Sequence, residues 1–121
     1  MGVVAGIAGI VLALMMMGTG VMKLRGHDMV KANMDRLGVN ERLTRMIGID
    51  EVLASVGIAI GLFADGSSWE WVGFLAGVGV IVLMLGALFY HQRAGDPQKE
   101  MVPAAAALVL AVLYLAGIMA R

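Results

Sequence analysis

The sequence contains no cysteine, only two prolines and few charged residues. Without cysteine the chain cannot form disulfides, thiolate metal sites or thiol redox centres. Charged residues make up 15% of the 121 residues and hydrophobic residues 60%, whereas soluble domains have about 25% and about 45–50%. So short a chain cannot bury this excess of apolar surface in a core of its own. The composition therefore indicates a membrane protein whose first partner is the lipid bilayer.

Several classes of function lack support in the sequence. The formal net charge is zero, so we expect no bulk attraction to nucleic acid and no nucleic-acid partner. The two histidines, His27 and His91, lie far apart without a metal-binding spacing, so no metal site is predicted. No nucleophile-elbow, phosphate-loop or dinucleotide-binding pattern occurs. We therefore expect no resident cofactor and no catalytic residue, and no enzyme activity from this chain alone.

Four apolar runs cover residues 2–22, 46–64, 69–90 and 101–120. Each matches the roughly 17–25 residues that a helix needs to cross the hydrocarbon layer. Asp65-Gly66 predicts a turn, and Ser67 to Glu70 fit a capping box that opens the third run. Pro103 is expected in the first turn of the fourth helix. The sequence predicts an all-α, polytopic membrane four-helix bundle that forms one transmembrane domain over residues 1–121.

Residues 23–45 form the one long polar stretch. Asp28 is a candidate cap for a short helix that ends at Gly38. The apolar side chains of this helix fall roughly on one side: Met29, Val30, Met34 and Leu37. This pattern favours a short interfacial helix between the first and second spans. The alternative is a solvated loop with chance patterning.

The basic residues are distributed unevenly between the two ends of the spans. Apart from Arg121, every Lys and Arg lies in or beside the first and third loops: Lys23, Arg25, Lys31, Arg36, Arg42, Arg45, Arg93 and Lys99. The positive-inside rule then predicts that loops 23–45 and 91–100 are cytoplasmic and that both termini face outside.

Small residues spaced four apart recur in the spans, which allows helices to approach closely. The pairs are Gly2 and Gly6, Gly57 and Gly61, Gly73 and Gly77, and Ala107 and Ala111. We take them as evidence for a compact bundle, while a homo-oligomer remains an alternative use of the same faces.

Asp50 and Glu51 lie about one turn inside the second span, where a charge is costly and needs a partner. Counting the chain back and forth across the membrane brings Lys23, Tyr90 and His91 to the same layer. Adjacent helical residues differ by about 100° in direction, so the two carboxylates cannot face the same point. Glu51 lies on the face of its helix that carries the smaller side chains, so it is expected inside the bundle. Asp50 is expected to point toward the headgroups or a neighbouring subunit.

Three interpretations of this layer remain open. In the first, Glu51 pairs with Lys23 and His91 joins them in a ligand-binding pocket. In the second, the same ion pair is a structural clasp between the first two spans. In the third, Lys23 reaches the headgroups, His91 is solvated, and Glu51 is satisfied by backbone or by Ser55.

Four short segments resemble the DoxX-like family of small four-helix membrane proteins. They are GTGVMKLRG at 18–26, IGIDEVLA at 47–54, GIAIGL at 57–62 and LMLGA at 83–87, the last leading to His91. Lys23, Glu51 and His91 match positions of the family pattern. Asp50 departs from it, because an apolar pair is expected before the glutamate. The resemblance implies a four-helix bundle in the inner membrane and relatives associated with a thiosulfate:quinone oxidoreductase or with assembly.

The sequence leaves three functions open. The first is an accessory or assembly subunit that binds a larger membrane protein complex through its glycine faces and its polar layer. The second is a quinone- or lipid-binding component of a membrane redox system, with Glu51, His91 and Tyr90 around an apolar cavity. The third is a small proton-coupled carrier, which would require a dimer for alternating access.

Overall fold

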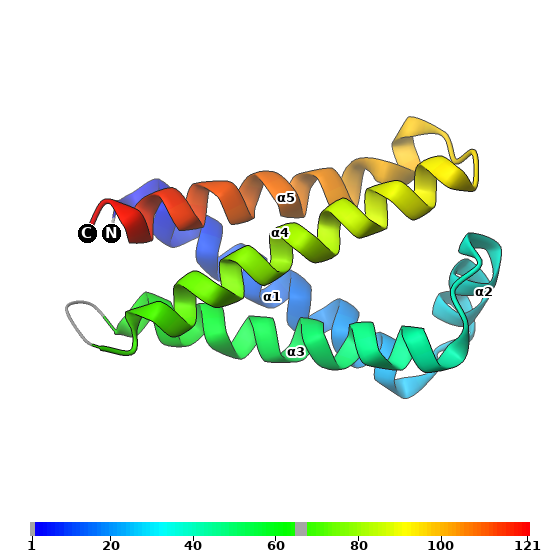
Figure 1. Ribbon diagram of the computed structural model, residues 1–121, viewed down its shortest axis with the longest axis horizontal. Helices are drawn as coiled ribbons and strands as arrows, with labels where there is room; N and C mark the ends of the chain where they lie inside the picture. The colour runs from blue at the N-terminus through cyan, green and yellow to red at the C-terminus, as the bar shows by residue number, and fades with distance from the viewer. Residues whose placement is uncertain (1, 65–67) are drawn as a thin grey trace.

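The computed structural model describes residues 2–64 and 68–121, which form five α-helices: α1 (Val3–Arg25), α2 (Asp28–Leu37), α3 (Glu41–Phe63), α4 (Glu70–Arg93) and α5 (Gln98–Met119). Figure 1 shows α1, α3, α4 and α5 along the long axis and the short α2 at one end. Among the described residues, these four helices are long and apolar enough to cross a membrane. The predicted all-α four-helix bundle, with a short helix between the first two spans, is confirmed.

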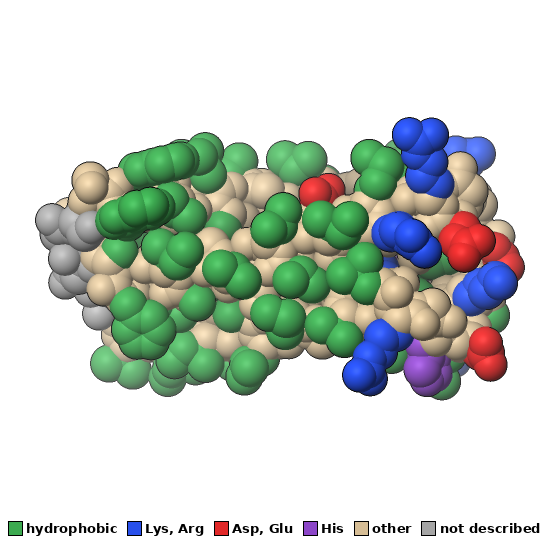
Figure 2. All heavy atoms as spheres, turned by 90° about the horizontal axis from the view of Figure 1, so that it is seen from below, with side chains coloured by type: hydrophobic (Ala, Val, Ile, Leu, Met, Phe, Trp, Pro, Cys, Tyr) green, Lys and Arg blue, Asp and Glu red, His purple; other side chains and the backbone are tan. Residues whose placement is uncertain are grey.

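Most of the charged residues gather at one end of the molecule. Figure 1 places both termini at the opposite end from α2 and the α4–α5 connection. Figure 2 shows most charged side chains of one face collected near one end, one acidic side chain nearer the middle, and hydrophobic side chains covering most of the rest. The separation fits a bundle whose middle lies in lipid and whose α2 end reaches the headgroups.

The helices extend beyond the apolar runs at this charged end. The second span was expected from residue 46, but α3 begins at Glu41. Asn40 stabilises this start, because its side chain accepts a hydrogen bond from the backbone N–H of Leu43 at 2.8 Å. An apolar run marks the part of a helix that faces lipid, whereas the helix itself continues until a cap ends it.

Two glycines separate α2 from the spans on either side. Gly26 and Gly38 have φ angles of 66° and 78°, a backbone conformation that residues with a Cβ rarely adopt. The predicted cap Asp28 was wrong: His27 occupies the N-cap position and Asp28 is the first helical residue. The ring Nδ1 of His27 accepts from the N–H of Met29 at 3.3 Å.

The apolar side of α2 is only partly covered. Leu37 is buried, and Val30 and Met34 are half-buried. Met29 is 65% exposed, so one of the four apolar residues assigned to this side faces outward.

Glycines mark the points where the long helices cross. A Cβ placed on Gly20 of α1 would lie 2.8 Å from the carbonyl oxygen of Gly48 on α3. A Cβ on Gly61 of α3 would lie 2.6 Å from the Cα of Gly73 on α4. Such distances leave room only for hydrogen, so these backbones pack directly against each other, as close helix association in a membrane requires.

The repeated small residues do not all serve the bundle. A Cβ on Gly57 would lie 2.7 Å from the Cβ of Ala76, and one on Gly77 would meet Leu115 at a similar distance. A Cβ on Gly2 or Gly6 would meet nothing within 4 Å. The first of the four predicted pairs therefore does not mark a close approach between helices.

The connections differ from expectation in two places. Residues 65–67 lie outside the described residues, so the predicted Asp65-Gly66 turn and the Ser67 end of the capping box are not described. Pro103 was expected in the first helical turn, but α5 begins at Gln98 and Pro103 lies inside the helix. The helix starts in the polar segment before the apolar run, which moves the proline into its second turn.

Candidate functional site

An ion pair joins α1 and α3 inside the charged half of the bundle. The ammonium nitrogen of Lys23 lies 2.7 Å from Oε1 of Glu51. Glu51 is 2% exposed, and the side chain of Lys23 is 15% exposed. A buried carboxylate in this position requires such compensation, because an isolated charge in a low-dielectric interior is strongly disfavoured.

The geometry of the two helices explains why these side chains meet. Side chains on an α-helix lean toward its N-terminus. On α1 this direction leads from Lys23 into the bundle, whereas on antiparallel α3 it leads from Glu51 toward the charged end. The close contact of Gly20 with Gly48 holds the helices near enough for the two groups to touch.

Thr19 is a member of this layer that the sequence argument missed. Its hydroxyl lies 2.5 Å from Oε2 of Glu51 and 3.0 Å from the carbonyl oxygen of Met15. The signal was present in the sequence, because Thr19 precedes Lys23 by four residues and so shares its helix face. The proposed alternative partner Ser55 instead donates to the carbonyl of Ala13 at 2.7 Å.

The carboxylate of Glu51 is charge-compensated but incompletely hydrogen-bonded. Its Oε1 is buried, and among residues 2–64 and 68–121 no donor meets it in hydrogen-bond geometry. The nearby ammonium of Lys23 satisfies the distance for an ion pair without the direction of a hydrogen bond. One buried acceptor therefore retains lone pairs for another donor.

The ion pair lines a cavity of about 360 Å³. All five helices contribute to its wall, which is mostly apolar, with methionine and leucine from α1, α2 and α4 and alanine from α4 and α5. Its polar members are Thr19, Lys23, Glu51, Tyr90 and His91. The volume lies within the roughly 300–1,000 Å³ of small-molecule pockets, which typically combine apolar walls with a few convergent polar groups.

His91 faces this cavity but does not join the ion pair. Its Nδ1 donates to Oδ2 of Asp96 at 2.6 Å, and Arg36 of α2 pairs with the other oxygen of the same carboxylate. Asp96 thereby links α2 to the end of α4. Asp96 was not predicted as a member of the site, and it lies in the short connection before α5.

The contacts of Asp96 also affect its acidity. The hydrogen bond from His91 lowers the pKa of the Asp96 carboxyl, and the positive charge of Arg36 acts in the same direction. Desolvation of the carboxyl opposes them but does not reverse the shift. The carboxylate form is therefore favoured while α2 is docked.

The two other predicted residues have different surroundings. Tyr90 lines the cavity, and its ring packs edge-on against Phe89 with 5.9 Å between centroids. Asp50 is exposed on the outer surface of the bundle, next to a hollow between α3 and α4. The structure thus brings together Lys23 and Glu51, places His91 and Tyr90 around the same cavity, and leaves Asp50 outside it.

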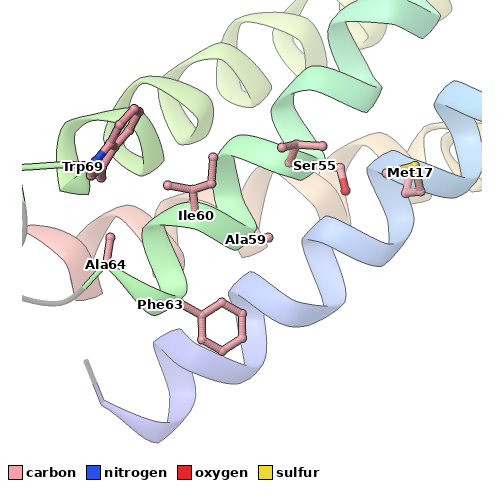
Figure 3. A pocket seen from close by; sticks show the side chains of 8 residues that line it. Met17, Ser55, Ala59, Ile60, Phe63, Ala64 and Trp69 are labelled. Carbon is pink, nitrogen blue, oxygen red and sulfur yellow. The ribbon is translucent and has the colours of Figure 1, made fainter.

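A larger hollow of about 660 Å³ lies in the other half of the molecule. Figure 3 shows its lining, with Phe63 and Ile60 of α3, Met17 of α1 and Trp69 at the start of α4. Its polar side chain, Ser55, already donates to a backbone carbonyl of α1. This open apolar groove suits acyl chains, so we place the candidate site at the cavity of the ion pair.

Among the described residues, no group of three or more His, Cys, Asp or Glu is arranged to hold a metal ion.

Comparison with known proteins agrees with the architecture. Neither the curated proteins nor the solved structures gave a match to the chain. The model of the DoxX-like family matches residues 7–114, a range that includes the ion pair, the cavity and His91. The chain is a small membrane protein that belongs to the DoxX-like family.

Proposed function

We propose that this protein binds a small amphipathic molecule of the quinone or lipid class within the membrane. The observation that carries the proposal is the apolar cavity of about 360 Å³ with the Lys23–Glu51 ion pair in its wall. An apolar body would occupy the cavity, and a polar head would contact the ion pair. Methionines in the wall, Met15, Met16 and Met34, adapt readily to ligands of irregular shape.

A quinone is a chemically suitable ligand because its ring oxygens accept hydrogen bonds and its reduced form also donates them. Lys23 supplies ammonium donors, and Glu51 supplies acceptors. Tyr90 and His91 add groups of both kinds at the cavity wall. In this role the chain holds and orients the molecule, and a partner protein carries out any electron transfer.

Filling the cavity tests this function. Gly86 lines the cavity, and a Cβ placed on it meets nothing within 4 Å, so Gly86→Leu should occupy space without a clash. Gly18 is equally unobstructed but lies outside the cavity lining, so Gly18→Leu is the matched control. After mild extraction, native mass spectrometry should detect a small-molecule adduct on the parent protein and on Gly18→Leu, reduced in Gly86→Leu. Equal adducts on both variants would refute cavity binding.

A second function, that of an accessory or assembly subunit in a larger membrane complex, is supported by Asp50. This carboxylate is exposed within the length of a spanning helix, and it has no hydrogen bond or ion pair with the described part of the chain. The adjacent hollow of about 510 Å³ is lined partly by small residues, among them Gly57, Ala76 and Gly79. A partner helix with a basic side chain at this depth would satisfy both features.

The accessory role has its own test. Asp50→Asn should reduce co-purification with the partner complex in mild detergent, whereas Asp35→Asn on the exposed face of α2 should not. Retention of the complex in Asp50→Asn would remove the support that this residue gives. We further propose a plasma or inner membrane location with α2 and residues 91–100 in the cytoplasm. The proton-coupled carrier stays a prediction without a specific observation in its favour.

A further inference from the structure

We propose that the cavity selects an uncharged ligand head that both donates and accepts hydrogen bonds, such as a hydroxyl or a quinol ring. The inference rests on the proposed binding function and names the ligand chemistry of that site. It arises from two properties of the ion pair: its net charge and its unused hydrogen-bonding capacity.

The charges in the cavity wall cancel each other. Lys23 and Glu51 are 2.7 Å apart, so together they present a dipole without net charge. The ring nitrogen Nδ1 of His91 is occupied by Asp96, whose other oxygen pairs with Arg36. A carboxylate, phosphate or ammonium head would therefore enter an apolar cavity without an opposite charge to accompany it, which is strongly unfavourable. A neutral head avoids this cost.

The same ion pair can both accept and donate further hydrogen bonds. Oε2 of Glu51 accepts from Thr19, while buried Oε1 has no hydrogen-bond donor within residues 2–64 and 68–121. A carboxylate offers about four lone-pair sites, and an ammonium offers three N–H donors. A hydroxyl at this point would donate to Oε1 of Glu51 and accept from Nζ of Lys23. One small neutral group would thereby use both halves of the pair.

The apolar wall determines where the rest of the ligand lies. Met15 and Met16 of α1, Leu83 of α4 and Ala107 of α5 line the cavity and offer no polar group to a ligand body. A hydrocarbon tail or apolar ring can extend along this wall while the head stays at the ion pair. The ligand is thus a single-headed neutral amphiphile.

A matched series of ten-carbon probes tests the selection: 1-decanol, decanoate and decylammonium at about pH 8, where the acid and the amine are charged. Binding is measured by native mass spectrometry on the full chain in nanodiscs of one lipid composition. Each affinity is expressed against the concentration of that probe measured in empty discs, so differences in lipid partitioning between the three probes do not enter the ranking. The parent protein should bind 1-decanol at least about tenfold more tightly than either ion.

Substitutions should then switch the preference. Glu51→Gln leaves the positive charge of Lys23 and should shift the ranking toward decanoate. Lys23→Met leaves the carboxylate and should shift the ranking toward decylammonium. The double variant restores a neutral wall and should again rank 1-decanol first. Thr19→Val, which does not change the net charge, should leave the order of the three probes unaltered.

The outcomes separate this inference from the binding function. Preference of the parent protein for decanoate or decylammonium would overturn the neutral-head inference while leaving cavity binding intact. Single variants that do not shift the ranking would have the same consequence. Absence of saturable binding for all three probes, together with equal native adducts in Gly86→Leu and Gly18→Leu, would overturn both. If a single variant does not fold, the ranking in the parent protein still decides, because it requires no substitution.

Discussion

The ion pair between Lys23 and Glu51 should have asymmetric energetics, because its two members differ in how well they can reach water. The carboxylate of Glu51 is on a short side chain and is 2% exposed. The lysine is long, lies near the charged end and keeps 15% of its side chain exposed, so it can redirect its ammonium toward the headgroups. Removing the lysine should therefore cost more than removing the glutamate.

The expected changes in the free energy of unfolding follow from the known behaviour of buried ion pairs. Lys23→Met leaves a buried carboxylate without compensation and should destabilise the folded protein by about 3–5 kcal/mol. Glu51→Gln should cost about 1–2 kcal/mol, because in the absence of an anionic ligand the freed ammonium can move toward water. The double variant leaves no uncompensated charge and should lie within about 1 kcal/mol of the parent. A positive coupling between the two sites is the expected result.

The assay is equilibrium unfolding in mixed micelles of dodecyl maltoside and sodium dodecyl sulfate, followed by far-ultraviolet circular dichroism. Lys31→Met provides the matched control, because Lys31 is exposed on α2 and its side chain has no hydrogen bond or ion pair with the described residues. The reasoning is refuted if Lys23→Met costs no more than this control, or if the two single-variant costs simply add in the double variant.

Three further predictions concern packing, pH and orientation. Gly61→Ala should lower stability by about 1–3 kcal/mol in the same assay, because its Cβ would lie 2.6 Å from a backbone carbon of α4, whereas the unobstructed Gly79→Ala should have little effect. The pKa of Asp96 is lowered in the folded state from 3.8, so its contribution is fully present above about that pH and is lost as the pH falls through the lowered folded-state value. The protection factors of α2 amides, which correct hydrogen-exchange rates for their intrinsic pH dependence, should therefore fall on acidification below about pH 3.8, and Asp96→Asn should remove this fall; an unchanged response in that variant would contradict the assignment. Because the chain lacks cysteine, Lys99→Cys can be labelled selectively, and a membrane-impermeant maleimide should react with it from the cytoplasmic side; labelling from outside in intact cells would reverse the proposed topology.

The long-range features of the fold could be predicted because the bilayer imposes them. Apolar runs of the required length define the spans, and the 100° step between residues correctly separated the directions of Asp50 and Glu51. The ends of the helices could not be predicted from hydrophobicity. For example, α3 begins among polar residues at Glu41, where the N-cap residue Asn40 fixes its start. Lipid exposure and helix length are determined by different interactions.

The partners of the candidate site were harder to predict for a related reason. The pairing of Lys23 with Glu51 depends on depth in the membrane, which chain counting supplies. The pairing of His91 with Asp96 depends instead on the fold of a short connection and on the docking of α2, and neither leaves a periodic signal. Thr19 was overlooked because a lone threonine in an apolar helix commonly bonds its own backbone, and its hydroxyl lies 3.0 Å from the carbonyl oxygen of Met15 here.

Photo-crosslinking tests most directly the claim that the cavity holds a ligand head at the ion pair. A 1-decanol probe with a diazirine in its chain would be bound to the protein in nanodiscs, irradiated, and mapped by peptide mass spectrometry. We expect labels on cavity residues such as Met16 and Leu83, with a reduced yield in Gly86→Leu. Labels confined to lipid-facing residues such as Leu53 and Leu85, with the same yield in Gly86→Leu, would contradict the proposed binding site.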